Sequence, residues 1–128
     1  ICVGMNFCVP NIIHPTAYID PSAKIGHGNF VGAFANIGAD VAIGDGNIIN
    51  TLSNLDHEVV AGCYNHFSPG AAVCGRCLIH DNTWVGAGAT LIDNISIASD
   101  TIIGAGAVIV SDILAGNNTY VGVPGKSL

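Results

Sequence analysis

Residues 37–49 read I-G-A-D-V-A-I-G-D-G-N-I-I, and an aliphatic residue returns at every sixth position of this stretch. These residues are Ile37, Ile43 and Ile49. A period of six fits neither an α-helix, whose apolar face repeats about every 3.6 residues, nor one continuous strand, whose repeat is about two. The stretch therefore predicts very short strands that are separated by regular corners.

The six-residue step extends over most of the chain. Every sixth residue from Ile13 to Val121 is apolar, without an insertion or a deletion. A mostly small residue lies two positions before each of them, and two inward-facing residues with this separation alternate as in a strand. Gly, Asp and Asn fill the corners, where positive φ angles are needed. Three hexapeptides then close one triangular coil, and residues 13–121 are expected to form about six coils stacked about 4.8 Å apart.

The composition argues against several kinds of partner. Only 9% of the 128 residues are charged, against about 25% in ordinary globular domains. The net charge of −6 disfavours nucleic acids and anionic membranes. No apolar run approaches the roughly 20 residues of a membrane span, and no signal peptide is visible. We therefore expect a cytoplasmic protein.

The five Cys are an odd number, and their spacing is not that of a secreted disulfide framework. Cys74-Gly-Arg-Cys77 resembles half of a zinc motif, but no second Cys or His pair has a matching spacing. We therefore expect reduced thiols and no metal. Residues 1–12 precede the repeat, and we interpret them as a lead-in that can be the remnant of a missing α/β domain. Residues 13–128 are expected to form the β-helix domain with its C-terminal tail.

The central stretch carries candidate chemistry. His57 and Gly75 are eighteen residues apart, so the repeat places them at the same corner of successive coils. Acyl transfer requires a base that accepts a proton and an N–H group that stabilises the oxyanion, which a His beside a free amide can supply. Glu58, the only Glu, can fix the tautomer of His57. The alternative is an exposed corner His with Glu58 as an ordinary surface residue, and the spacing alone does not choose between them.

Several strings resemble a known family. They are D-H-E-V-V-A-G-C-Y-N-H-F at 56–67, G-A-A-V-C-G at 70–75, V-G-A-G-A-T at 85–90 and Y-V-G-V-P-G-K at 120–126. Together they resemble the hexapeptide-repeat acyltransferases, whose fold is a left-handed parallel β-helix. Within that family they look like the bacterial sugar-nucleotide N-acetyltransferases of bacillosamine and perosamine synthesis, together with the sialic acid O-acetyltransferases. The resemblance covers residues 12–128.

The resemblance implies an activity and a set of site residues. It implies an acetyl-CoA-dependent acetyltransferase that acts on an amine of an activated, nucleotide-linked amino sugar. By this resemblance His57 is the general base and Glu58 is its partner. His66 then lies close to the acetyl group, and the amide of Gly75 contacts the thioester carbonyl. The resemblance also implies that Ala87 and Ala105 line the pantetheine groove, and that Pro124 and Lys126 lie near the nucleotide end of coenzyme A. Most members of the subgroup have an N-terminal α/β domain for the nucleotide sugar, and we expect no such domain within residues 1–128.

The positions of these residues predict a shared site. His57 and Gly75 fall on one corner column, whereas Ala87 and Ala105 fall on a second column that is expected to continue to Val123. Two corners are separated by a hexapeptide, up to about 20 Å of strand, so one pantetheine arm is not expected to touch both columns of one chain. A homotrimer in which neighbouring chains bring the two columns together would solve this.

The sequence leaves three other functions open. One is a sugar O-acetyltransferase of the sialic acid type. The second is a γ-type carbonic anhydrase, which needs three His on zinc, although the closest pair here, His57 and His66, is nine residues apart. The third is a non-enzymatic β-helix that serves as an assembly surface, although the Thr residues do not form a ladder along one face.

Overall fold

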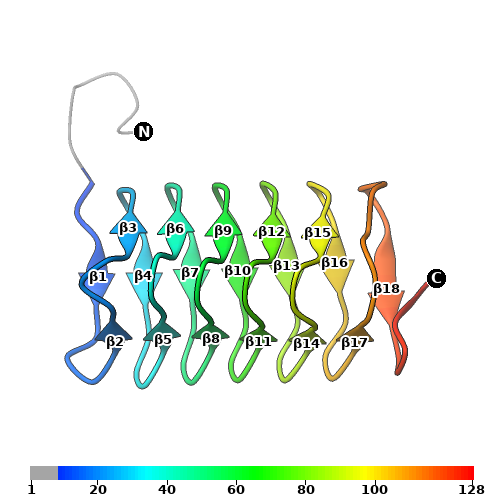
Figure 1. Ribbon diagram of the computed structural model, residues 1–128, viewed down its shortest axis with the longest axis horizontal. Helices are drawn as coiled ribbons and strands as arrows, with labels where there is room; N and C mark the ends of the chain where they lie inside the picture. The colour runs from blue at the N-terminus through cyan, green and yellow to red at the C-terminus, as the bar shows by residue number, and fades with distance from the viewer. Residues whose placement is uncertain (1–8) are drawn as a thin grey trace.

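The computed structural model describes residues 9–128, and the proposed lead-in therefore lies largely outside the described residues. The described chain is a row of stacked triangular coils, with one strand in each side of most coils (Figure 1). Within residues 9–128 every regular element is a strand, and no helix is present. The predicted parallel β-helix of about six coils is confirmed.

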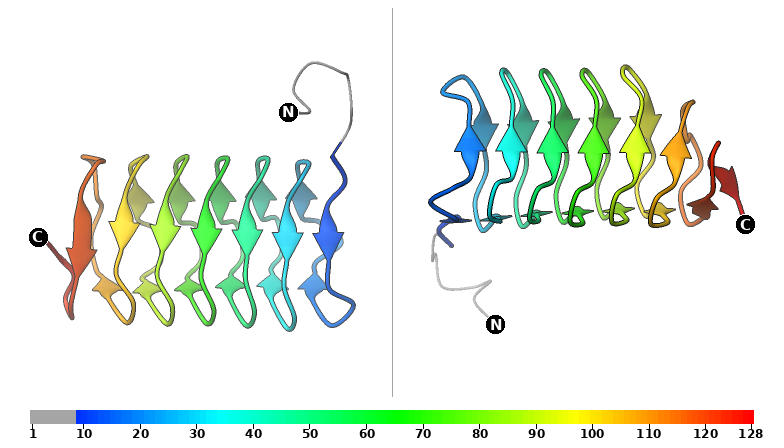
Figure 2. Two further views of the ribbon diagram at one scale, coloured as in Figure 1. Left: turned by 180° about the vertical axis from the view of Figure 1, so that it is seen from behind. Right: turned by 90° about the horizontal axis from the view of Figure 1, so that it is seen from below.

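The strands form three sheets, one on each side of the prism (Figure 2). Sheet A contains β1 (Ile12–Ile13), β4 (Phe30–Val31), β7 (Ile48–Ile49), β10 (His66–Phe67), β13 (Trp84–Val85), β16 (Ile102–Ile103), β18 (Thr119–Val121) and β19 (Lys126–Ser127). Sheet B contains β2 (Tyr18–Ile19), β5 (Asn36–Ile37), β8 (Asn54–Leu55), β11 (Ala72–Val73), β14 (Thr90–Leu91) and β17 (Val108–Ile109). Sheet C contains β3 (Lys24–Ile25), β6 (Ala42–Ile43), β9 (Val60–Ala61), β12 (Leu78–Ile79) and β15 (Ser96–Ile97).

The register between coils is constant over most of the prism. Phe67 pairs with Ile49 below and with Val85 above, a step of eighteen residues in each direction. The aliphatic phase fills the axis, and Ile37, Leu55 and Leu91 are fully buried there. The small phase is buried beside it, as at Ala35. The constant step means that a residue's neighbours in the adjacent coils can be found by adding or subtracting eighteen.

A ladder of buried amides runs up the prism before sheet A. The N–H of Asn47 donates to Oδ1 of Asn29 at 2.7 Å, and the N–H of Asn65 donates to Oδ1 of Asn47 at 2.8 Å. Oδ1 of Asn65 in turn accepts from the N–H of Thr83. Such pairing removes the cost of burying amide groups away from water. Among residues 9–128, Nδ2 of Asn65 is the single enclosed side-chain polar atom without a partner.

The predicted phase is wrong beyond Ile109. We expected Ala115 and Val121 on the axis, but Ala115 is exposed and Val121 is 36% exposed. Ile113 pairs with Ile97 and is buried in place of Ala115, because the last side of this coil is two residues shorter. An Ile side chain buries more apolar surface than an Ala side chain, which favours the shorter register.

The chain end closes the last coil. Tyr120 pairs with Ile103 and packs against the core, so the step is now seventeen residues. The step of eighteen that placed Val123 above Ala105 is therefore wrong here. The carbonyl of Gly122 accepts the N–H of Val108, the role that Ala107 has for Thr90 one coil below. β18 then turns back into β19, its antiparallel partner. No helix in the described part of the chain is long and apolar enough to cross a membrane.

Candidate active site

His57 and Gly75 lie at successive levels of one corner, as the repeat predicts. His57 follows β8 and precedes β9, and Gly75 lies between β11 and β12, so both belong to the corner that joins sheets B and C. The N–H of Arg76 donates to the carbonyl of His57 at 2.9 Å and ties the two turns together. The corner therefore stacks a His side chain directly below a glycine.

The imidazole of His57 covers the Cα of Gly75. A Cβ on Gly75 would lie 2.5 Å from Cε1 and 2.6 Å from Nε2 of His57. Gly75 is the one buried residue at its corner phase within residues 9–128, and its N–H makes no hydrogen bond with the described residues. Buried N–H groups are nearly always paired, so the unpaired amide of Gly75 is unusual.

Glu58 orients the imidazole. Its Oε2 lies 3.0 Å from Nδ1 of His57. Glu58 adopts φ = 59°, an uncommon conformation for a residue with a Cβ, and the corner imposes it. Because a carboxylate can only accept, Nδ1 carries the proton and Nε2 has a free lone pair. This geometry suits proton abstraction by Nε2, although both side chains are about half exposed.

Arg76 is a site residue that the sequence reasoning missed. Its Nη1 lies 3.8 Å from Oε2 of Glu58, the same oxygen that contacts Nδ1 of His57. Arg76 lies eighteen residues after Glu58, at the same left-handed corner position with φ = 59°. The step of eighteen would have found it. The contact is between two half-exposed side chains, and such pairs contribute at most about 1 kcal/mol.

His66 does not join His57 within one chain. It lies on β10 in sheet A, whereas the corner of His57 joins the other two sheets. Its ring packs against that of Trp84, with centroids 5.1 Å apart. Partial burial lowers the pKa of His66 below its usual value of 6.5, because desolvation disfavours the imidazolium form.

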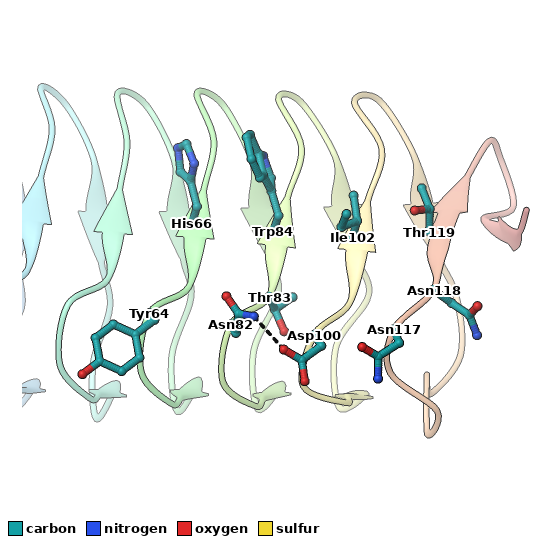
Figure 3. Close-up of a pocket in the computed structure, with 10 residues that line it drawn as sticks. All are labelled: Tyr64, His66, Asn82, Thr83, Trp84, Asp100, Ile102, Asn117, Asn118 and Thr119. Carbon is teal, nitrogen blue, oxygen red and sulfur yellow. Dashed lines mark hydrogen bonds between the residues drawn. The ribbon is translucent and has the colours of Figure 1, made fainter.

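A pocket of about 450 Å³ opens beside His66 (Figure 3). It lies over sheet A and the corner that leads from sheet C into it. Its lining contains Tyr64, His66, Asn82, Thr83, Trp84, Asp100, Ile102, Asn117, Asn118 and Thr119. Nδ2 of Asn82 donates to Oδ1 of Asp100 at 2.6 Å. Apart from His66, the sequence reasoning named none of these residues.

Ala87 and Ala105 form a smooth edge at a different corner, between sheets A and B. Both are exposed. The glycines that follow them, Gly88 and Gly106, have positive φ angles and nothing within 4 Å of where a Cβ would lie. An edge of small residues lets an extended chain lie close to the backbone. As predicted, this edge and His57 lie on separate corners.

Pro124 and Lys126 lie beyond the last coil. The N–H of Gly125 donates to the carbonyl of Val108 at 2.7 Å, which anchors the turn next to the edge that ends at Ala105. A Cβ on Gly125 would collide with Cδ1 of Ile109. The tail therefore packs against β17 at the end of the prism.

Two cysteines of the central region have thiols that favour the protonated form. Burial raises the pKa of the Cys74 thiol and of the Cys77 thiol, and Sγ of Cys77 donates to the carbonyl of Ile92. Within the described residues, no group of three or more His, Cys, Asp and Glu side chains could hold a metal ion.

The family profile of the bacterial transferase hexapeptide (six repeats) matches residues 76–111. The chain belongs to the hexapeptide-repeat family. The acetyltransferase domain of PglB from Neisseria gonorrhoeae FA1090 is 39% identical, with a TM-score of 0.95 over 98% of this chain and 61% of that chain. The same domain is also known in complex with acetyl coenzyme A.

A second relative is a sugar acetyltransferase. PerB from Caulobacter crescentus, in complex with CoA and GDP-perosamine, is 39% identical, with a TM-score of 0.90 over 95% of this chain and 58% of that chain. The hexapeptide-repeat chain described here thus spans about three fifths of these relatives. A comparison with curated protein sequences gave no match. The predicted resemblance to sugar N-acetyltransferases is confirmed.

Proposed function

We propose that this chain is an acetyl-CoA-dependent acetyltransferase that acetylates an amine of a nucleotide-linked amino sugar. One observation carries the proposal: the imidazole of His57 lies against the Cα of Gly75, whose N–H is unpaired among the described residues, while its Nδ1 contacts Glu58. Further support comes from the relatives, because PglB is described with acetyl coenzyme A and PerB with CoA and GDP-perosamine.

The proposed reaction begins at Nε2 of His57. The amine nitrogen attacks the thioester carbonyl carbon, and Nε2 accepts a proton from the nitrogen as the C–N bond forms. The carbonyl oxygen becomes an oxyanion and accepts a hydrogen bond from the N–H of Gly75. When the C–S bond breaks, the thiolate of coenzyme A leaves and takes the proton back from His57. The products are the N-acetyl sugar and free coenzyme A.

Glu58 and Arg76 support the base. The Glu58 carboxylate keeps the proton of neutral His57 on Nδ1 and stabilises the imidazolium that forms during the attack. Arg76 contacts the same oxygen from the next coil and limits the motion of the Glu58 side chain. The guanidinium of Arg76 makes no hydrogen bond with the His57 imidazole or the Gly75 N–H, so Arg76 is a positioning residue.

We also propose that the site is completed by a second copy of the chain. The base lies at the corner between sheets B and C, and the small-residue edge that suits pantetheine lies at the corner between sheets A and B. A C3 homotrimer would place the base of one chain against the edge of the next, with Pro124 and Lys126 near the nucleotide end of coenzyme A. His66 would then lie near the acetyl group.

The test is an acetyl-transfer assay on the purified chain. Acetyl-CoA is mixed with a panel of GDP- and UDP-linked amino sugars, and free thiol is measured over time. We expect thiol release that depends on one amino sugar, is lost in His57→Ala and yields an N-acetyl product by mass spectrometry. Thiol release with an O-acetyl product would replace the proposed acceptor, and no release with any amino sugar would contradict the proposed function.

A further inference from the structure

Asn50 has a fixed amide orientation. It follows β7 at the edge of sheet A, and its Oδ1 accepts a hydrogen bond from the N–H of Thr51 at 2.8 Å. A backbone N–H can only donate, so the atom that faces it must be the oxygen. The Nδ2 group of Asn50 is therefore the atom that faces away from Thr51. This hydrogen bond settles an orientation that otherwise depends on the choice between two similar atoms.

Asn50 in turn determines the tautomer of His66. Nδ2 of Asn50 lies 3.3 Å from Nε2 of His66. The amide NH₂ group donates and cannot accept, so Nε2 of His66 must be the acceptor. An imidazole that is neutral and accepts at Nε2 carries its proton on Nδ1. If a hydrogen-bond acceptor lay beside Nε2 instead, the proton would be on Nε2 and Nδ1 would be the acceptor.

The surroundings favour neutral His66. Desolvation lowers its pKa, so the imidazole is unprotonated near neutral pH. Trp84 packs against the ring, and the Trp84 Nε1–H donates to Oγ of Ser68, a buried side chain, at 2.9 Å. Asn50 and Trp84 thus hold His66 from the coil below and from the coil above (Figure 3 shows the His66 and Trp84 side chains).

The remaining ring nitrogen is available to a ligand. Nδ1 of His66 makes no hydrogen bond with residues 9–128, and it is not among their enclosed polar atoms. His66 lines the pocket over sheet A. A neutral ring that is held on two sides therefore offers one N–H donor to whatever occupies this region.

We propose that Asn50 is a positioning residue that makes His66 a hydrogen-bond donor through Nδ1–H, and that the acceptor is the carbonyl oxygen of the acyl donor. The identity of the acceptor rests on the proposed function, whereas the tautomer does not. His66 cannot serve as a second base in this state, because Nε2 is taken by Asn50 and Nδ1 is protonated. Of the two site histidines, only His57 accepts the proton of the attacking amine.

Nitrogen NMR of the ligand-free protein tests the tautomer directly. Long-range ¹H–¹⁵N correlation spectra of ¹⁵N-labelled chain distinguish a protonated from an unprotonated ring nitrogen. For His66 at pH 7.5 we expect a protonated Nδ1 and an unprotonated Nε2. A majority of the Nε2-protonated form in the wild-type protein would overturn the proposal.

Two variants separate positioning from packing. Asn50→Asp replaces the donor by a carboxylate of the same shape, and we expect the His66 proton to move to Nε2. Thr51→Pro removes the N–H that orients Asn50, at a corner position where the chain already has Pro15, Pro21 and Pro69, and we expect a mixture of tautomers. Asn54→Asp adds the same charge on sheet B and should leave His66 unchanged. An unchanged tautomer in Asn50→Asp would overturn the positioning role.

Addition of acetyl-CoA to the labelled protein tests the acceptor. We expect the Nδ1 and Hδ1 signals of His66 to shift, and the Kd for acetyl-CoA to rise up to about tenfold in Asn50→Asp, the effect of one lost hydrogen bond. If acetyl-CoA binds and leaves the His66 signals unchanged, His66 does not donate to the acyl donor. That result would contradict the acceptor but not the proposed function. If thiol release is absent and the His66 tautomer is as expected, the proposed function is contradicted but the role of Asn50 is not.

Discussion

The ring of His57 occupies the space that a side chain on Gly75 would need, with Cε1 only 2.5 Å from the position of a Gly75 Cβ. The base and the amide are therefore mutually dependent. A side chain at 75 displaces the imidazole, and loss of the imidazole leaves this side of Gly75 open. Several of the predictions below follow from this dependence.

His57→Ala should lower kcat by about 10²- to 10⁴-fold, because a positioned general base contributes this much to proton transfer. Binding of coenzyme A, measured by calorimetry, should persist. Glu58→Gln should lower kcat less, because an amide still contacts Nδ1 but no longer stabilises the imidazolium. The measurement is steady-state thiol release with the accepted amino sugar. Turnover near the wild-type value in His57→Ala would show that another group is the base.

Gly75→Ala should reduce activity strongly with little loss of stability. The φ angle of Gly75 is not in the left-handed region, so the backbone accepts Ala, and the strain is relieved if the His57 ring swings away. A double-mutant cycle provides the control. In a His57→Ala background, Gly75→Ala should change neither kcat nor Tm further. Full activity of the single variant would mean that the ring need not lie over residue 75 during catalysis.

Ile43→Asp should unfold the domain, whereas Asp45→Ala should be mild. Ile43 is 5% exposed on the axis, and an unpaired carboxylate there costs several kcal/mol against a stability of about 5–15 kcal/mol. Oδ1 of Asp45 accepts the N–H of His27 at an exposed corner, a contact of about 1 kcal/mol. Thermal melts followed by circular dichroism decide the comparison. Similar Tm values for the two variants would contradict the assignment of the inward phase.

Because of His66, the free energy of unfolding should fall in mildly acidic solution. Its folded-state pKa lies below the unfolded value of 6.5, so the unfolded chain binds more protons between those two values. The free energy of unfolding therefore decreases as the pH falls from about 6.5 towards the folded-state pKa, and the loss is complete below the folded-state pKa. The charged and titratable groups that line the pocket with His66 are Asp100 and Tyr64.

A matched variant isolates the contribution of His66. His66→Gln keeps a polar side chain of similar reach without a titrating group. When the pH is lowered from 7.5 to 5, the Tm of the wild type should fall more than the Tm of this variant. A constant difference over this range would show that His66 titrates equally in the folded and unfolded states.

Mixed oligomers should test the shared site. Ala105→Trp blocks the exposed small-residue edge, and His57→Ala removes the base on the other corner. Each variant alone should be inactive, but co-refolded mixtures should regain activity because some interfaces pair two intact corners. Light scattering establishes the oligomeric state. Full activity in a monodisperse monomer, or no recovery in well-mixed trimers, would contradict the shared site.

The sequence predicted the prism because both inward phases repeat with little variation, and no other fold explains a period of six. It failed after Ile109, where Ile113 and Ala115 are both apolar and the count alone favours the wrong one. Only the packing of side chains against the last full coil distinguishes them. Residue numbers therefore predict the register only while the length of each side is constant.

The site was predictable to the extent that it follows the step of eighteen. That step places Gly75 on His57, and it would have placed Arg76 beside Glu58 and Trp84 beside His66. The contact of Asn50 with His66 was out of reach, because it joins different phases, sixteen residues apart, through their side-chain conformations. Contacts between residues eighteen apart can be predicted by counting along the sequence. Contacts between residues at different positions of the hexapeptide can be found only in the structure.

The constant register has a consequence for how such an enzyme can change. The base and the amide lie at one corner of adjacent coils, so their levels differ by the spacing of about 4.8 Å between the paired strands, which every folded coil enforces. An inserted or deleted residue between them that is not absorbed in a protruding loop would shift all later coils. Selection can therefore exchange the side chains at a corner, but it cannot change the distance between one coil and the next in small steps. A new activity must arise from other side chains at the same positions along the prism axis.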